Sequence, residues 1–389
     1  LNMMGGTHAT ASREFLLPNA FNAKHTKMLK DAVNIPVFIG HNIFSPEDAE
    51  KMLAEGNADF VALGRSQLAE PAWAKKAKEG RASDIKPCIN CLIGCIDRGM
   101  LSHTPIHCTV NPSLYRFECK PVEKAETRRQ VAVVGAGPAG CEAALTASKR
   151  GHQVTIYEKR CIGGAMIEAS KPENKANIKR LIHYYEDHII HDPNITLVKE
   201  EVEYETLVHS GYDAVIIAVG GKTRILNVPG IEKNSVIYAS DYLNGSTAVT
   251  GNTVVVIGGG ITGAETALEL NAEGKKVTIV EMTDAFLANF SSACQAYLAT
   301  INETDIKILT GKRLTAVHEN NVILTDRWGN ETTVPADSVV IAAGFTRQNE
   351  LSDKLEENTD MQVFNVGDSK RVRQIYDAIH EGLIAARQI

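Results

Sequence analysis

The sequence predicts an α/β fold with two separate parallel sheets, and three observations support this prediction. Two segments that align on each other each join a β-branched run, the pattern Gly-x-Gly-x-x-Gly, an Ala- and Leu-rich stretch and a second β-branched run. Each is followed by a buried-strand run that ends in glycine, at 212–221 and 337–344. A closing strand and helix are expected at 363–368 and 374–388. The 389 residues are enough for two or three domains of about 150 residues each.

The repeated segments run from Val131 to Glu158 and from Val254 to Glu281, an offset of 123 residues. A lone glycine triplet is a weak signal, but here a strand leads into each triplet and a helix leads out. In such a Rossmann-type unit the first glycine permits the tight turn, the second lets a pyrophosphate approach the backbone, and the third lets helix and strand pack closely. The terminal glutamate can accept hydrogen bonds from a ribose diol. The alternative is two βαβ units with tight turns and no ligand.

The residues after Glu281 indicate which nicotinamide nucleotide the second unit would take. Met282, Thr283 and Asp284 follow it, so the local sequence offers no Arg or Lys to neutralise a 2′-phosphate. A carboxylate at this place repels that phosphate, and we therefore expect NADH rather than NADPH. The region 246–345 contains only one cysteine, Cys294, and no Cys-x-x-Cys lies near either glycine pattern, which disfavours a disulfide reductase.

The region before Val131 has the pattern of two βα units in tandem. Ser45 is expected to cap a helix that has proline at its first position and acidic residues in its first turn. The expected order is a strand at 35–39, a helix at 46–56, a strand at 60–63, a turn at 64–65 and a further helix that opens near Pro71.

Cysteines are concentrated between the tandem βα units and the first glycine-rich repeat, in the spacing Cys88-x2-Cys91-x3-Cys95-x12-Cys108. Three thiolates within eight residues suit the closely spaced corners of a [4Fe–4S] cluster. Structural zinc more often uses two separated Cys-x-x-Cys pairs. Zinc and unligated core cysteines stay open as alternatives. Cys119 falls outside the spacing.

The arrangement from Val131 onward resembles flavoproteins in which a nicotinamide domain is inserted into a Rossmann-like FAD domain. By that resemblance Gly367 and Asp368 would approach the ribityl chain of FAD. FAD itself would be held by Gly135, Gly137, Gly140 and Glu158, and the nicotinamide dinucleotide by Gly258, Gly260, Gly263 and Glu281.

The first 80 residues resemble the end of the FMN-binding (β/α)8 TIM barrel of the old-yellow-enzyme class. The matching features are Ile35-Pro36-Val37, Gly40, the helix SPEDAEKMLAEG, Ala58-Asp59-Phe60-Val61 and Gly64-Arg65. In such barrels the last two strand-end loops bind the phosphate, so the resemblance implies roles for Gly40, Gly64 and Arg65 toward FMN. A barrel needs at least about 200 residues, so we expect the chain to be a fragment that lacks roughly five βα units. Open strand edges would leave residues 1–80 loosely ordered, aggregation-prone or paired with another chain, and a homo-oligomer is one outcome to test.

Taken in this order, the motifs resemble those of bacterial NADH:flavin oxidoreductases related to 2,4-dienoyl-CoA reductase, 2-enoate reductase and trimethylamine dehydrogenase. The resemblance implies electron flow from NADH through FAD and a [4Fe–4S] cluster to FMN, and reduction of an α,β-unsaturated carbonyl or enoyl-CoA substrate. His8 matches the catalytic histidine of the reductases, although Thr7 and Ala9 depart from their pattern. A loop histidine without a catalytic role is the alternative.

That resemblance implies five segments. They are the barrel end at 1–80, the cysteine segment at 81–120, the two parts of the FAD domain at 121–245 and 346–389, and the NAD(P)H domain at 246–345.

Charge and hydropathy limit the partners. The net charge of −6 gives no electrostatic footprint for nucleic acid or an anionic membrane surface. Apolar stretches fall far short of the about 20 residues that cross a bilayer, and no signal peptide opens the chain. We therefore expect a cytoplasmic protein with a small-molecule substrate. Two rivals stay open: an amine dehydrogenase of the same architecture, and a non-catalytic electron-transfer fragment that binds FAD and NADH.

Overall fold

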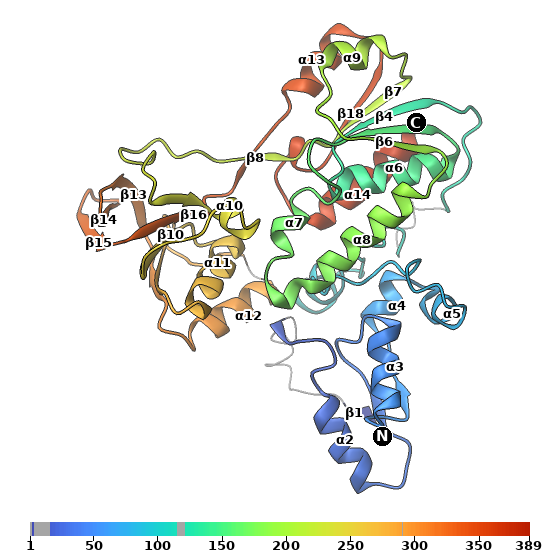
Figure 1. Cartoon of the computed structure of the whole chain (residues 1–389), viewed down its shortest axis with the longest axis horizontal. Coiled ribbons are helices and arrows are strands. Elements are labelled where there is room, and N and C mark those ends of the chain that lie inside the picture. Colours follow the sequence, from blue (N-terminus) through green and yellow to red (C-terminus); the bar gives the residue numbers. More distant parts are fainter. Residues whose placement is uncertain (1, 4–15, 115–120, 290) are drawn as a thin grey trace. The chain divides into compact units, whose positions relative to one another are not determined.

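A computed structural model describes residues 2–3, 16–114, 121–289 and 291–389 (Figure 1). The chain divides into two compact units, one made of 1–221 together with 347–389 and the other of 222–346. The second unit contains the expected nicotinamide domain and adds two strands and a helix in front of it. His8 and Cys119 lie outside the described residues.

The first unit opens with short βα elements around a parallel sheet of order β1-β2-β3. Helix α3 begins as its cap predicts, because Ser45 Oγ accepts a hydrogen bond from the backbone N–H of Asp48 at 3.0 Å. Ile39, Ile43 and Met52 form part of a small buried cluster beneath it. The elements are β1 (Asn2–Met3), α2 (Ala23–Ala32), β2 (Phe38–Ile39), α3 (Pro46–Ala54), β3 (Phe60–Val61), α4 (Arg65–Ala69) and α5 (Trp73–Lys78).

One local prediction in this region is wrong. Residues 64 and 65 were expected to form a turn before a helix near Pro71, but α4 already begins at Arg65. The carbonyl oxygen of Gly64 accepts the N–H groups of Gln67 and Leu68, which closes the first helical turn. A second short helix, α5, then follows Pro71.

The main sheet of the first unit is fully parallel, with strand order β18-β7-β4-β5-β6. Alternate residues of β4 face opposite cores: Val131 and Val133 pack with α6, α8 and α14, whereas Ala132 and Val134 pack with α9 and α13. The strands are β4 (Gln130–Val134), β5 (Gln153–Tyr157), β6 (Ile195–Val198), β7 (Ala214–Ile217) and β18 (Gln362–Asn365). The helices are η2 (Ile93–Leu101), α6 (Pro138–Arg150), α7 (Met166–Ala169), η3 (Glu173–Lys175), α8 (Ala176–Ile190), α9 (Tyr204–His209), α13 (Glu350–Asn358), η4 (Gly367–Ser369) and α14 (Ile375–Gln388).

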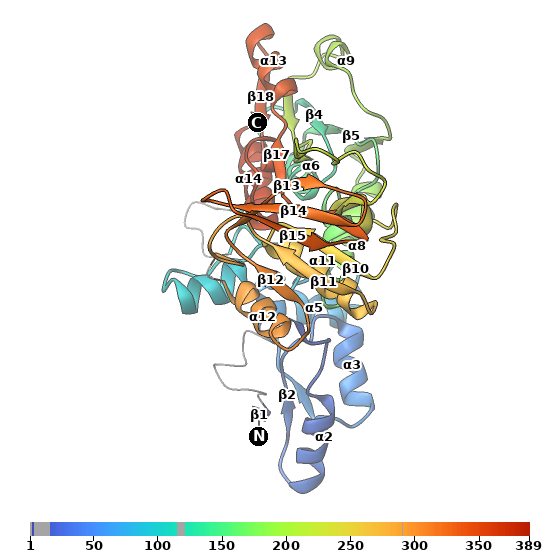
Figure 2. The ribbon, with the colours of Figure 1, turned by 90° about the vertical axis from the view of Figure 1, so that its left-hand side faces the viewer.

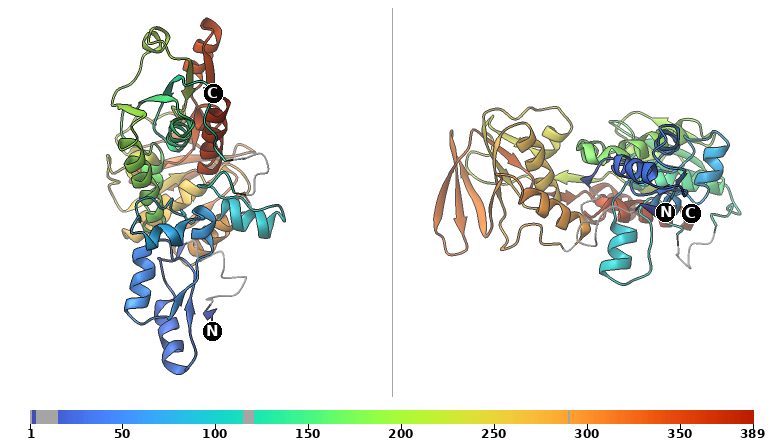
Figure 3. Two further views of the ribbon diagram at one scale, coloured as in Figure 1. Left: turned by 90° about the vertical axis from the view of Figure 1, so that its right-hand side faces the viewer. Right: turned by 90° about the horizontal axis from the view of Figure 1, so that it is seen from below.

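The π-helical segment η2 carries part of the cysteine pattern. It extends from the body of the first unit in both views of Figure 3, where it is drawn in cyan. The chain after η2 then returns to α14, with which His107 and Cys108 form hydrogen bonds.

The second unit repeats the parallel sheet, with order β12-β11-β10-β16-β9. Helix α11 packs on β10 and β11, and Val255 and Ile257 of β10 pack with an antiparallel meander of β13, β14 and β15 (Figure 2). The strands are β8 (Gly221–Thr223), β9 (Val236–Tyr238), β10 (Thr253–Ile257), β11 (Lys276–Val280), β12 (Lys307–Leu309), β13 (Lys312–Val317), β14 (Asn321–Asp326), β15 (Glu331–Pro335), β16 (Ser338–Ile341) and β17 (Phe345–Arg347). The helices are α10 (Ala239–Leu243), α11 (Ile261–Ala272) and α12 (Ser292–Ile301).

The predicted α/β class with two Rossmann-type sheets is confirmed. Within the described residues, no helix combines the length and apolar character needed to cross a membrane.

The glycine turn of the second unit gives a test of the packing argument. A Cβ on Gly263 would lie 1.9 Å from the carbonyl oxygen of Gly258, whereas a Cβ on Gly260 would meet nothing within 4 Å. Gly263→Ala should therefore lower the free energy of unfolding by roughly 2–3 kcal/mol. Gly260→Ala should lower it by at most about 1 kcal/mol, because it only changes the helix cap. Urea denaturation followed by circular dichroism measures both, and equal losses would contradict the steric role of Gly263.

Candidate cofactor-binding sites

The first glycine-rich turn joins β4 to α6 and is held by the carboxylate of Glu158. Oε2 of Glu158 accepts a hydrogen bond from the N–H of Ala136 at 2.8 Å, and Oε1 accepts one from the backbone N–H of Arg160 at 2.7 Å. A Cβ on Gly137 would have the Cα of Gly164, 4.0 Å away, as its nearest neighbour. The turn therefore leaves room for a phosphate at the N-terminus of α6.

The second turn reproduces these contacts between β10 and α11. Oε2 of Glu281 accepts a hydrogen bond from the N–H of Gly259 at 2.7 Å, and Oε1 accepts one from the N–H of Thr283 at 2.8 Å. A cavity of about 170 Å³ borders Gly260, Glu281 and Thr283. The internal repeat thus extends from the residue spacing to the hydrogen bonds of each turn. Both glutamates hold their own glycine turn, and their remaining lone pairs can accept hydrogen bonds from a ribose.

Gly367 and Asp368 lie in η4, between β18 and α14. The N–H of Gly367 donates to Oε2 of Glu381 at 2.8 Å, and Oδ1 of Asp368 accepts the N–H of Arg373 at 3.0 Å. Burial raises the pKa of the Asp368 carboxyl. A Cβ on Gly367 would contact Ala139, so this turn lies against the first turn of α6 and adjoins the same glycine-rich loop.

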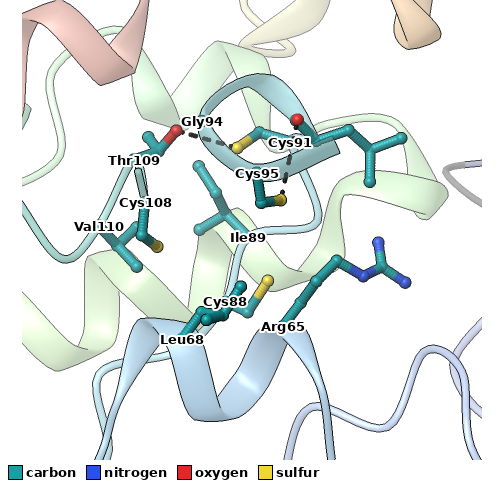
Figure 4. A pocket seen from close by; sticks show the side chains of 11 residues that line it. Arg65, Leu68, Cys88, Ile89, Cys91, Gly94, Cys95, Cys108, Thr109 and Val110 are labelled. Atoms are coloured by element: carbon teal, nitrogen blue, oxygen red, sulfur yellow. Dashed lines mark hydrogen bonds between the residues drawn. The ribbon is translucent and has the colours of Figure 1, made fainter. Parts of the chain in front are cut away.

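Four cysteines that are separate in the sequence line one pocket, together with Arg65 (Figure 4). All four are free thiols, and desolvation raises the pKa of Cys91 and raises the pKa values of Cys88, Cys95 and Cys108 to about 12. Thiols in this environment stay protonated at neutral pH and are poor nucleophiles. The pocket therefore does not have the chemistry of a reactive dithiol, whereas a bound metal would displace the protons.

Backbone N–H groups next to Cys91 point toward its sulfur atom. Asn90 and Leu92 have positive φ values of 54° and 62°, which are uncommon for residues with side chains. This conformation turns the N–H groups of Ile93 and Gly94 toward the Cys91 sulfur, where their hydrogen bonds favour the thiolate. Successive N–H groups of this kind form a concave anion-binding surface that recurs at iron–sulfur sites.

Hydrogen bonds reach the other cysteines as well. The N–H of Asn90 lies 3.4 Å from the Cys88 sulfur, and those of Val110 and Asn111 face the sulfur of Cys108. The pocket is therefore supplied with donors from both cysteine-bearing stretches of chain.

A buried ion pair attaches the start of the cysteine segment to α6 and α8. Nζ of Lys86 lies 2.6 Å from Oε2 of Glu142, and that same oxygen accepts a hydrogen bond from the Tyr185 hydroxyl at 2.9 Å. The ammonium group of Lys86 also lies 5.5 Å from the ring centroid of Tyr185. Removing one partner of such a buried pair strongly destabilises the fold, because the other charge would be left buried and uncompensated.

The end of the cysteine segment is attached to α14. Nδ1 of His107 lies 2.9 Å from the hydroxyl of Tyr376, and Nε2 of His380 donates to the carbonyl oxygen of Cys108 at 2.9 Å. The rings of Tyr376 and His380 stack at 4.0 Å between centroids. The sequence analysis missed these residues, because no spacing pattern connects positions so far apart in the chain.

Arg65, which the resemblance assigns to the FMN phosphate, has two side-chain partners in the structure. Its guanidinium donates to the side-chain oxygens of Asn42, at 2.8 Å, and of Asn90. Gly64 precedes it as the cap of α4, and Gly40 follows β2 and lies against Ala62. Arg65 therefore links the strand-end loops of the first βα units to the cysteine pocket.

Comparison with known proteins identifies the family. Residues 129–382 match the pyridine nucleotide-disulphide oxidoreductases. The chain belongs to this family. Residues 9–84 match a second one, the NADH:flavin oxidoreductase / NADH oxidase family. The resemblance to NADH:flavin oxidoreductases inferred from the motifs is thereby confirmed.

Two similar family members and one solved structure have both parts within longer chains. An NADH oxidase of Thermoanaerobacter brockii is 38% identical over 93% of this chain and 56% of its own length. A bilirubin reductase of Mediterraneibacter gnavus is 33% identical over 99% of this chain and 60% of its own. The structure of a 2-naphthoyl-CoA reductase with 2-naphthoyl-CoA, 29% identical, superimposes with a TM-score of 0.89 over 100% of this chain and 60% of its own. The chain thus spans between half and two thirds of the length of these proteins.

Gly94 allows the two cysteine-bearing stretches to meet, which gives a second prediction. A Cβ on Gly94 would lie 2.8 Å from the carbonyl oxygen of His107 and 3.2 Å from the Cα of Cys108. Gly94→Ala should therefore push these stretches apart, lower stability by about 2 kcal/mol and speed alkylation of the four pocket thiols. Gly99→Ala is the matched control, because its Cβ would meet only the side chain of Ile106. Mass spectrometry after iodoacetamide labelling measures the effect, and equal labelling of the two variants would contradict it.

Proposed function

We propose that this chain carries the electron-input part of an NADH-dependent flavin oxidoreductase that reduces an α,β-unsaturated carbonyl or enoyl thioester substrate. The observation that carries the proposal is the presence, in one chain, of two matching dinucleotide turns and a four-cysteine pocket. When bound, FAD, a [4Fe–4S] cluster and FMN would supply the conversion from hydride transfer to single-electron transfer and back.

The FAD site would be built on the first turn. Glu158 accepts a hydrogen bond from the turn, and Gly137 leaves space for the pyrophosphate. Asp368 follows Gly367, which packs against the first turn of α6. The residues assigned to FAD are Gly135, Gly137, Gly140, Glu158, Gly367 and Asp368.

The NADH site would be built on the second turn, where the cavity next to Glu281 is open to a nucleotide. The carboxylate of Glu281 is already fixed by two backbone N–H groups, so it is oriented before the ribose arrives. The residues assigned to NADH are Gly258, Gly260, Gly263 and Glu281.

The cysteine pocket supports a [4Fe–4S] cluster held by Cys88, Cys91, Cys95 and Cys108. The four thiols line one pocket and face backbone donors. In the described part of the chain, no group of three or more His, Cys, Asp or Glu side chains is arranged to hold a metal ion. The cluster is therefore proposed from the spacing of the four cysteines, because three thiolates within eight residues suit the corners of a cube better than a zinc site.

The attachments of this segment support a role between two flavins. Its two ends are fixed to α6 and α14, the helices that border the proposed FAD turn, while Arg65 connects it to the loops with Gly40 and Gly64 that are assigned to FMN. His8, as partner of a proton donor to the substrate, completes the proposal. The substrate class follows the relatives named reductases, and oxidation of an amine is the rival outcome.

Gly137→Val tests the FAD site. A Cβ at this position meets no atom closer than the Cα of Gly164, at 4.0 Å, and the valine side chain fills the space assigned to the pyrophosphate, so the purified variant should lack flavin absorbance. Its urea unfolding should stay within about 1 kcal/mol of that of the wild-type apoprotein. A variant that retains stoichiometric FAD would contradict the assignment.

Serine variants of the pocket cysteines test both the proposed cluster and the proposed electron transfer from FAD to FMN. Anaerobically prepared wild-type protein should contain about four irons and four sulfides per chain. Replacing any of the four pocket cysteines by Ser should labilise this cluster, whereas replacing the exposed Cys161 should not. In the holoenzyme, these pocket variants should lose NADH-dependent reduction of enoyl substrates but keep NADH-dependent dye reduction.

Two other results would contradict the proposal. One zinc per chain and no iron would make the pocket a structural clip. Amine oxidation by the holoenzyme, with no reduction of any unsaturated carbonyl, would favour the rival enzyme class.

A further inference from the structure

An ion pair lies beside the nucleotide cavity of the second unit. Asp284 stands between Thr283 and Ala285, both of which line the cavity. Its Oδ2 lies 3.4 Å from Nη1 of Arg327, and both side chains are largely exposed. The sequence near Glu281 contains no cation, but the fold places one directly against this loop.

The antiparallel meander brings Arg327 to this position. The N–H of Gly311 donates to the carbonyl oxygen of Thr283 at 2.8 Å, which ties the start of β13 to the loop after β11. In the β13–β14 ladder, Lys312 pairs with Asp326, the residue before Arg327. The β14–β15 turn is therefore fixed next to Asp284 by backbone register.

The guanidinium of Arg327 has a second partner besides Asp284, the ring of the adjacent Trp328. Its Cζ lies 4.3 Å from the ring centroid of Trp328. The carboxylate of Asp326 accepts hydrogen bonds from the N–H groups of Trp328 and Asn330, both at 2.9 Å, and these bonds brace the turn. An arginine that is oriented in this way loses less entropy when it forms a bidentate pair with a phosphate.

We propose that Asp284 and Arg327 together set the choice between NADH and NADPH. Asp284 occupies the guanidinium of Arg327 and repels a 2′-phosphate, so the site accepts the ribose diol of NADH. Without the Asp284 carboxylate, Arg327 becomes a phosphate partner. The inference rests on the proposed nucleotide site and names its specificity-determining residues.

Calorimetric titration with 5′-AMP and 2′,5′-ADP tests this without requiring activity, because the two ligands differ only in the 2′-phosphate. Wild-type protein should bind 5′-AMP more tightly. Asp284→Asn should increase the affinity for 2′,5′-ADP about tenfold and change the affinity for 5′-AMP less than about twofold. Asp284→Asn combined with Arg327→Gln should remove the gain.

Glu319→Gln is the matched control. It removes one exposed carboxylate of the same meander, at the opposite end of β13, and should leave both affinities unchanged. A gain for 2′,5′-ADP that persists in the double variant would overturn the role of Arg327. If wild-type protein binds 5′-AMP but Asp284→Asn does not change the affinity for 2′,5′-ADP, the inference is overturned while the nucleotide site stands. Binding of neither ligand by wild-type protein would overturn both.

Discussion

Helix α6 can begin directly after its glycine turn only because Gly140 has no side chain. A Cβ there would lie 1.9 Å from the carbonyl oxygen of Gly135. The same end of the helix touches α14, where a Cβ on Gly382 would lie 2.2 Å from the carbonyl oxygen of Ala139. Two missing side chains thus let one helix contact both the turn and a neighbouring helix, and the other elements of the first unit are placed by this packing.

The cysteine segment depends on this packing although it lies outside the dinucleotide fold. Glu142 of α6 holds its beginning through Lys86, and His380 of α14 holds its end through the carbonyl of Cys108. A shift between the two helices would therefore move the two ends of the segment relative to each other. The segment with the four thiols and the first glycine turn thus contact the same pair of helices, as the proposed electron transfer between them would require.

The two dinucleotide units share their turns but differ in what surrounds them. In the first, the helices beside the turn hold the cysteine segment. In the second, an antiparallel meander brings charged residues to the loop after the glutamate. The family name includes disulphide oxidoreductases, yet the second unit has the single cysteine Cys294, buried in α12 and next to no second cysteine in the sequence. The two units of this chain thus differ in the segments added to a common turn, not in the turn itself.

The sequence by itself determined the elements whose geometry is local. Strand, glycine turn and helix follow from backbone sterics within about ten residues, and the Ser45 cap follows from one side chain and the N–H three residues later. It also established the spacing of the four cysteines. Only the tertiary structure decided that Arg65 meets Asn90, that His380 meets Cys108, and that Arg327 lies against Asp284. Such pairs join segments far apart in the chain, and their meeting depends on sheet register and helix packing, which no local pattern encodes.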